Sequence, residues 1–315
     1  MIRTNRWGVA LAAAITIGGM CAGAGGASAI ELRPMLGAKA GTGEGAAAGA
    51  VTLRTRSVDS LKRLFDGLGF DLTAVPYGVP VPRVLVSEIP DGIKAMKSPQ
   101  RRTQVFRKIL LPLILHANET ILRDRKRLLA LKRKRAIGIT LSPRDASWLW
   151  SLALEYKVKR GGFKALLHRV DAIPPSLALA QAIEESGWGT SRYARKGNAI
   201  FGQETSLSAV HAMPGKYRGR RFKIKTFETL LAAVDAYARN LNTHPAYKKM
   251  RSERAMMRAR AQTPDGHALA GTLLRYSERG HAYVRTIRTI MTHYKLRDLE
   301  GAKLRSGTTI HVIKR

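Results

Sequence analysis

The sequence predicts a mainly α-helical protein of the α+β class with one small β-hairpin. Apolar residues recur at helical spacing in several segments, including residues 59–70 and a long segment that opens at Ser98 and runs to Arg135. Residues 206–226 are different: a basic segment surrounds the turn signal Pro214-Gly215 and ends in the alternating RFKIKTF, which is typical of a β-hairpin. With 45% apolar residues in a chain of 315, there is material for one ample core or two modest ones.

The chain is strongly basic. It has 55 Lys and Arg against 22 Asp and Glu, a formal net charge of +33, which excludes an acidic or neutral cytosolic enzyme as the default class. Such an excess is typical of a protein with a polyanionic partner, and the alternative is a solvated basic surface without one. The one cysteine, Cys21, lies in a segment that we expect to be removed, so the mature chain has no internal disulfide and no Cys-based zinc or redox site.

Residues 1–29 are typical of a secretory signal peptide. Arg3 and Arg6 precede an apolar run from Trp7 to Met20, and the segment ends in Ala27-Ser28-Ala29, an A-x-A cleavage signal. The alternative is a retained membrane anchor, but the run is shorter than the ~20 residues of a spanning helix. We therefore expect a periplasmic or secreted protein without a transmembrane segment after cleavage. Loss of the two arginines reduces its charge from +33 to +31.

Three further regions are predicted from composition and pattern. Residues 30–56 are rich in Gly and Ala and predict a flexible linker, and residues 57–160 predict an N-terminal helical region. Within that region Pro112 predicts a kink or break in the long helix. The last residues, 297–315, are predicted to be a basic tail.

The segment PPSLALAQAIEESGWG carries the chemistry. It predicts a helix that begins near Pro175, ends at Ser186-Gly187, and holds Glu184 and Glu185 in its last turn. The negative end of the helix dipole and apolar neighbours such as Trp188 raise a carboxyl pKa, which suits a general acid. Adjacent helical residues point about 100° apart, so at most one of the two enters a cleft. The alternative is a solvated helix end, and local physics does not choose between the two residues.

The longer segment QAIEESGWGTSRYARKGNAIFGQ resembles the signature of the bacterial Bax-type glucosaminidases, peptidoglycan hydrolases allied to glycoside hydrolase family 73. VPRVLVSEIPDGIK, RKILLPLILHANETIL, FETLLAAVDAYARNLNTHPAY and YSERGHAYVRTIR resemble the same family, and together the pieces cover about residues 57–296. The resemblance implies a lysozyme-like helical fold with a β-hairpin lobe, and a catalytic domain over residues 161–296.

The resemblance also implies roles for single residues. Glu185, immediately before Ser-Gly-Trp-Gly, would protonate the leaving oxygen of a β-1,4 bond after N-acetylglucosamine, and Glu184 is the weaker candidate. Residues expected to bind substrate in the cleft are Trp188, Asn198, Phe201, Gln203, Tyr247 and Tyr283. The aromatic ones have an alternative role in the core, and Asn198 has one in a turn.

The sequence differs from that family at the place where a second catalytic carboxylate is expected. Glycosidases ordinarily use two acids, and family 73 members often place the second in the hairpin, but residues 205–226 contain none. The remaining candidates are Glu204, Asp235 and Glu278, and we favour Glu204 because it directly follows GNAIFGQ. Without a second acid, the 2-acetamido group of the substrate would serve as nucleophile.

These features favour an exported endo-β-N-acetylglucosaminidase that needs no metal or other cofactor. The eight histidines are scattered, and neither an H-E-x-x-H motif nor a Gly-rich phosphate loop is present.

Two alternative functions remain: a lytic transglycosylase, and a non-catalytic protein that binds the cell wall or another polyanion. Expected partners are glycan strands and an anionic wall or outer-membrane surface, with no nucleic acid. Wall binding should weaken with salt, which screens exposed charges over ~8 Å at physiological ionic strength.

Overall fold

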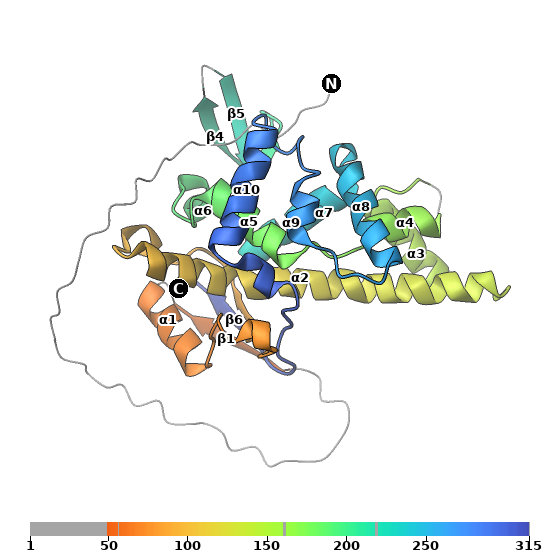
Figure 1. The fold of residues 1–315 in the computed structure, drawn as a ribbon, viewed down its shortest axis with the longest axis horizontal. Coiled ribbons are helices and arrows are strands. Elements are labelled where there is room, and N and C mark those ends of the chain that lie inside the picture. Colours follow the sequence, from red (N-terminus) through yellow and green to blue (C-terminus); the bar gives the residue numbers. More distant parts are fainter. Residues whose placement is uncertain (1–48, 56, 160–161, 218–219, 315) are drawn as a thin grey trace, which may run out of the picture.

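The computed structural model describes residues 49–55, 57–159, 162–217 and 220–314. Helices dominate it (Figure 1), as the sequence predicted. The helices are α1 (Val58–Gly67), α2 (Pro99–Ala136), α3 (Pro143–Glu155), α4 (Phe163–Arg169), α5 (Pro175–Ser186), α6 (Arg192–Gly197), α7 (Leu230–Thr243), α8 (Lys248–Ala259), α9 (Gly266–Ala270) and α10 (His281–His293). Short 3₁₀ turns are η1 (Val75–Tyr77), η2 (Ile93–Ala95), η3 (Pro245–Tyr247) and η4 (Leu296–Leu299).

Helix starts follow the capping signals in the sequence. The Ser98 hydroxyl accepts a hydrogen bond from the Arg101 amide at the start of α2, and Ser142 does the same for Asp145 at α3. A proline follows each cap at the first helical position, where its missing N–H is no loss. The local sequence is therefore enough to set these helix starts.

Helix α2 does not break at Pro112. It continues for 38 residues from Pro99 to Ala136 with the proline inside it, so the prediction of a break was wrong. The surrounding side chains of Leu110, Leu111 and Leu113 are fully buried, because α2 packs against α5, α7 and strand β2. Burial of each such side chain contributes ~1.5–3 kcal/mol. Together they outweigh the ~3 kcal/mol that a proline costs inside a helix.

A three-stranded parallel sheet joins the two ends of the described chain. Its strands are β1 (Ala50–Arg54), β6 (Thr309–Ile313) and β2 (Val84–Val86), in the order β1-β6-β2. Figure 1 shows it beside α1, below α2. Residues 50–54 were predicted to belong to the flexible linker 30–56 and residues 309–313 to the basic tail, and both predictions are corrected here. The pairing uses backbone groups from opposite ends of the chain, which local composition does not reveal.

The β-hairpin is present, but its turn is not where the sequence predicted it. Strands β4 (Ala212–Tyr217) and β5 (Arg220–Lys225) pair so that Tyr217 lies opposite Arg220. Pro214 and Gly215 therefore lie within β4, the edge strand of the order β3-β5-β4, with β3 formed by Glu204–Thr205. An edge strand tolerates proline. A Cβ at Gly215 would lie 2.1 Å from the Phe222 ring, so this glycine leaves room for its cross-strand partner.

Helix α5 lies at the centre of the core. All its residues except Glu184 and Glu185 are buried, and it packs against α2, α9, α10 and η4. Gly187 ends it in the left-handed conformation with φ of 55°. The surrounding elements thus fix the last turn of α5, and with it the two glutamates.

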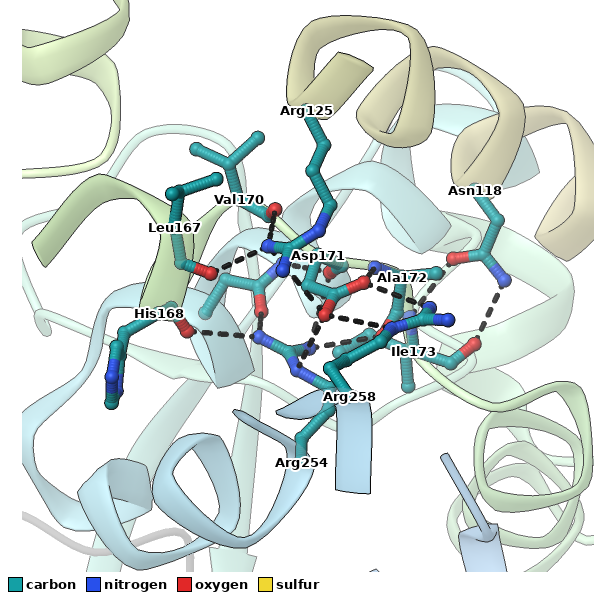
Figure 2. A network of polar contacts seen from close by, with 11 residues as sticks. Asn118, Arg125, Leu167, His168, Val170, Asp171, Ala172, Ile173, Arg254 and Arg258 are labelled. Atoms are coloured by element: carbon teal, nitrogen blue, oxygen red, sulfur yellow. Dashed lines mark hydrogen bonds and ion pairs between the residues drawn. The ribbon is translucent and has the colours of Figure 1, made fainter. Parts of the chain in front are cut away.

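A buried ionic network holds the loop that enters α5 (Figure 2). The carboxylate of Asp171 accepts hydrogen bonds of 3.2 and 3.0 Å from Arg258, and lies 3.6 Å from Arg125 and 3.8 Å from Arg254. Arg254 is fully buried and also donates to the carbonyls of Asp171, Ala172 and His168. These arginines come from α2 and α8, so one carboxylate joins two helices to the start of α5.

The signal peptide predicted for residues 1–29 and the linker predicted for residues 30–48 lie outside the described residues. Within the part of the chain that is described, no helix is both long and apolar enough to cross a membrane.

Candidate active site

Glu185 lies in the last turn of α5 with its side chain partly buried. Burial raises the pKa of Glu185 to about 8. A hydrogen bond from the Tyr283 hydroxyl opposes this rise, the charge of Glu184 adds to it, and the charge of Arg279 opposes it. Loss of hydration is the largest of these effects, so the carboxyl is mostly protonated at neutral pH.

A chain of hydrogen bonds orients the Glu185 carboxyl. The Tyr283 hydroxyl donates to Glu185 Oε1 over 2.9 Å and accepts from Gln181 Nε2 over 2.9 Å. The Tyr237 hydroxyl in turn donates to Gln181 Oε1 over 2.7 Å. Gln181 stands one helical turn before Glu185, while Tyr283 comes from α10 and Tyr237 from α7. Side chains from three helices therefore determine that Oε1 of Glu185 accepts this hydrogen bond.

Glu184 points to a different partner. Its Oε1 accepts a hydrogen bond of 2.5 Å from Arg279 Nη1, and Arg279 Nη2 donates to Thr286 over 2.7 Å. This ion pair keeps Glu184 at the α10 side of the helix end. The two adjacent glutamates thus have separate surroundings, as the helical geometry requires.

The loop after α6 lies against the other oxygen of Glu185. Gly202 has φ of 56°, and a Cβ built there would lie 3.3 Å from Glu185 Oε2. Oε1 is held by Tyr283, so Oε2 is the oxygen that faces the loop. The segment GNAIFGQ therefore lies beside the candidate acid.

Gly202→Ala is expected to lower catalytic activity several-fold while the protein still folds. The left-handed φ strains any L-residue by ~1–2 kcal/mol, and the added methyl would crowd Oε2. Steady-state kinetics on glycan together with a thermal melt measure both effects. Gly138→Ala, which has φ of 79° and no neighbour within 4 Å of the built Cβ, is the matched control for strain alone. Equal activity of the two variants would contradict the placement of Gly202.

Comparison with known proteins shows the family to which the chain belongs. A family model described as Glucosaminidase, mannosyl-glycoprotein endo-beta-N-acetylglucosaminidase, matches residues 162–296. Protein bax of Escherichia coli is 35% identical over 203 residues, which are 62% of this chain and 71% of that protein. The chain belongs to the Bax-type glucosaminidase family. It is accordingly a glycoside hydrolase.

Other similar proteins match this Bax-type chain less extensively. Exo-glucosaminidase LytG of Bacillus subtilis is 31% identical over 84 residues, 24% of this chain and 30% of that protein. The glycoside hydrolase domain of Salmonella typhimurium FlgJ superposes with a TM-score of 0.28 and 20% identity, covering 47% of this chain and 96% of that one. The catalytic domain of the autolysin Auto of Listeria monocytogenes gives 0.32 and 17%, covering 54% and 96%.

The structure places the predicted aromatic residues of this Bax-type protein differently from one another. Phe201 is buried and stacks on Tyr237 with ring centroids 3.8 Å apart. Tyr247 is buried 5.8 Å from Tyr276, and its pKa is raised mainly by burial, with a contribution from the charge of Glu185. Trp188 is half-buried and packs edge-on against Phe106 and Tyr294, at 6.0 and 4.6 Å. Tyr283 alone of the four predicted aromatic residues hydrogen-bonds to Glu185.

Asn198 and Gln203 also differ in their surroundings. Asn198 has φ of 51° and its Nδ2 donates to the carbonyls of Phe227 and Glu228, both at 3.1 Å, so it holds the loop against the segment that precedes α7. Gln203 is buried, and its Nε2 has no hydrogen-bond partner among the described residues. Asn198 thus has a structural role, whereas Gln203 keeps a donor available.

The three candidates for a second acid come from three different parts of the fold. Glu204 lies in β3 opposite Ile224, Asp235 lies on α7 near Arg239 and Glu155, and Glu278 lies between α9 and α10. The acid whose charge acts on Glu185 is Glu184. No group of three or more His, Cys, Asp or Glu among the residues described is placed to hold a metal ion.

Sequence reasoning missed the residues that support Glu185. Gln181, Tyr237 and Tyr276 complete the cluster, and the Tyr276 ring stacks on Tyr283 with centroids 5.4 Å apart. The spacing of four between Gln181 and Glu185 was a usable signal, because such residues share a helix face. The tyrosines come from distant segments and carried no such signal.

Proposed function

We propose that this glycoside hydrolase is an exported endo-β-N-acetylglucosaminidase that cleaves β-1,4 bonds of peptidoglycan strands, with Glu185 as the general acid. The observation that carries the proposal is a carboxyl whose pKa is raised to about 8 and whose orientation is fixed by Tyr283. A carboxylic acid must be protonated at the working pH to protonate a leaving oxygen. The glucosaminidase family model supports a glycan that contains N-acetylglucosamine as the substrate.

The geometry supports different roles for the two carboxyl oxygens of Glu185. Oε1 accepts the Tyr283 hydrogen bond, so the proton resides on Oε2 beside Gly202, where the glycosidic oxygen would approach. After proton transfer the carboxylate is stabilised by the Tyr283 hydroxyl and by the positive charge of Arg279. The site thus favours the protonated form of Glu185 before the transfer and stabilises its carboxylate afterwards.

The step after protonation has two chemically distinct forms, and Glu204→Gln separates them. Glu204 would act as base or nucleophile if glycan binding brings it to the anomeric carbon, and removal of such a group lowers kcat ~10²-fold or more. If the 2-acetamido group of the substrate is the nucleophile, the variant keeps its rate to within a few-fold. In that case a glycan with the acetyl group removed should not be cleaved.

Digestion of purified peptidoglycan tests the proposed activity. After borohydride reduction, mass spectrometry should show reduced N-acetylglucosamine ends from the parent protein and none from Glu185→Gln. Anhydro ends would instead assign the chain to the lytic transglycosylases, and binding without cleavage would make it a wall-binding protein. Long fragments early in the digest indicate endo cleavage, whereas release of single units would match the exo activity in the name of the Bacillus relative.

Activity should fall as the pH rises through about 8. Only protonated Glu185 can act as acid, and its pKa is raised to about 8 mainly by burial. A profile of kcat/KM against pH on soluble glycan chains measures this limb, since kcat/KM reports the free enzyme. A basic limb near pH 4.5, the ordinary value of a glutamate, would contradict the assignment of Glu185.

We also propose that the chain acts in the cell envelope. The support is the signal-peptide pattern of residues 1–29 and the net charge of +33, which suits a wall rich in peptide carboxylates. Binding of the mature protein to isolated walls should weaken steadily as salt is added. Binding that persists unchanged in 1 M salt would contradict an electrostatic attachment.

A further inference from the structure

We propose that a pocket beside Glu185 binds a carboxylate-bearing peptide on the substrate, so that the enzyme prefers glycan strands that carry stem peptides to bare strands. This inference rests on the proposed peptidoglycan hydrolase function. It adds a binding site for an acidic peptide to a site that otherwise recognises sugar.

The pocket has a volume of about 310 Å³ and opens between α7, η3 and the end of the hairpin. Ala236 and Ala246 line part of its wall, and their small side chains leave the cavity open there. Gln203 and Glu204 line it from the loop after Gly202, and Arg275 lines it from the segment before α10. The pocket is therefore assembled from segments that are distant in the sequence.

The charge of the pocket is strongly positive. Its basic lining residues are Lys157, Lys225, Arg239 and Arg275, against one acid, Glu204. Arg239 pairs with Glu155. Lys157 and Arg275 are exposed and enter no ion pair among the described residues. His244 also lines the pocket. Its pKa is lowered first by burial and then by the positive charges of Lys157 and Arg251.

Neutral donors accompany these cations. Gln203 is 9% exposed, and its Nε2 has no hydrogen-bond partner among the residues described. Such a buried donor is costly unless a ligand satisfies it. The Tyr247 hydroxyl hydrogen-bonds with Asn240, and both residues line the pocket. Amide and hydroxyl groups beside free cations suit a peptide, which offers carbonyl oxygens and a terminal carboxylate together.

The pocket shares a wall with the candidate catalytic site. Gln203 directly follows Gly202, whose built Cβ lies 3.3 Å from Glu185 Oε2. Tyr247 also lines the pocket, and the charge of Glu185 contributes to the raised pKa of its phenol. A group bound here is therefore a substituent close to the bond being cleaved. Lys157 lies before residues 162–296, so the N-terminal region supplies one cation to the pocket.

Steady-state kinetics on three substrates test this inference. The substrates are glycan strands with intact stem peptides, the same strands after an amidase has removed the peptides, and strands whose peptide carboxylates have been amidated. The full chain should cleave the first with a kcat/KM about tenfold higher than the other two, since a pair of charged hydrogen bonds is at stake. The double variant Lys157→Gln/Arg275→Gln should lose this preference, mainly through a higher KM for the first substrate.

The matched control is Lys132→Gln/Arg135→Gln, which removes one exposed Lys and one exposed Arg at the far end of α2. It should keep the preference between substrates even if overall wall binding weakens. A thermal melt confirms that each variant folds. Equal kcat/KM on all three substrates, or the same change of preference in both double variants, would overturn the peptide pocket while leaving the glucosaminidase function intact. Failure of the parent protein to cleave any of the three would instead refute the proposed function.

Discussion

Glu185→Gln is expected to lower the rate of glycan cleavage by about 10²–10⁴-fold, the usual contribution of a general acid. Glutamine keeps the size of the side chain and can still accept the Tyr283 hydrogen bond, but it has no proton to deliver. The initial rate of release of reducing ends from peptidoglycan measures the loss. Binding of the variant to glycan should remain, because the substitution removes chemistry rather than surface.

A second variant distinguishes the roles of the two glutamates. Glu184→Gln should retain cleavage and move the basic limb of the pH profile to lower pH, because the charge of Glu184 helps to raise the pKa of Glu185. Comparable losses in the two variants would remove the distinction between the glutamates.

The fold should gain stability from Glu185→Gln near neutral pH. A folded-state pKa above the unfolded value means that stability falls as the pH rises from about 4.5 to about 8, and a neutral glutamine escapes this loss.

Asp171→Asn is expected to destabilise the fold by about 3–5 kcal/mol, the usual cost of removing one partner from a buried ion pair. Asp171 is 1% exposed, and the substitution leaves Arg254, also 1% exposed, without a compensating negative charge. Arg125 and Arg258 would lose the same partner. Urea unfolding followed by circular dichroism measures the change in the free energy of unfolding.

The control is Asp145→Asn at the start of α3. Asp145 pairs with Arg127 at 2.8 Å and with Lys134 at 3.9 Å on the surface, where such pairs contribute about 0–1 kcal/mol. If Asp171→Asn also changes stability by less than 1 kcal/mol, the network in Figure 2 does not hold the loop that enters α5. A large loss would show that the buried ionic contacts of Asp171 stabilise the fold around the start of α5.

Local patterns predicted much of the helical structure. Ser98, Ser142 and Gly187 mark helix ends through hydrogen bonds and backbone conformations that involve only nearby residues, so the sequence contains that information. The break expected at Pro112 and the turn expected at Pro214-Gly215 did not form, because packing decides the roles of these residues. A buried helix tolerates the first, and an edge strand accommodates the second.

By itself, the sequence determined the helical class, the hairpin, the family and the position of Glu185 at a helix end, because each depends on short-range patterns or on a contiguous motif. Only the tertiary structure decided that Tyr283 donates a hydrogen bond to the Glu185 carboxyl while Glu184 pairs with Arg279. It also decided that the two ends of the described chain join in one sheet. These outcomes depend on which distant segments pack together and exclude water, and the free energy of that burial is a property of the whole fold.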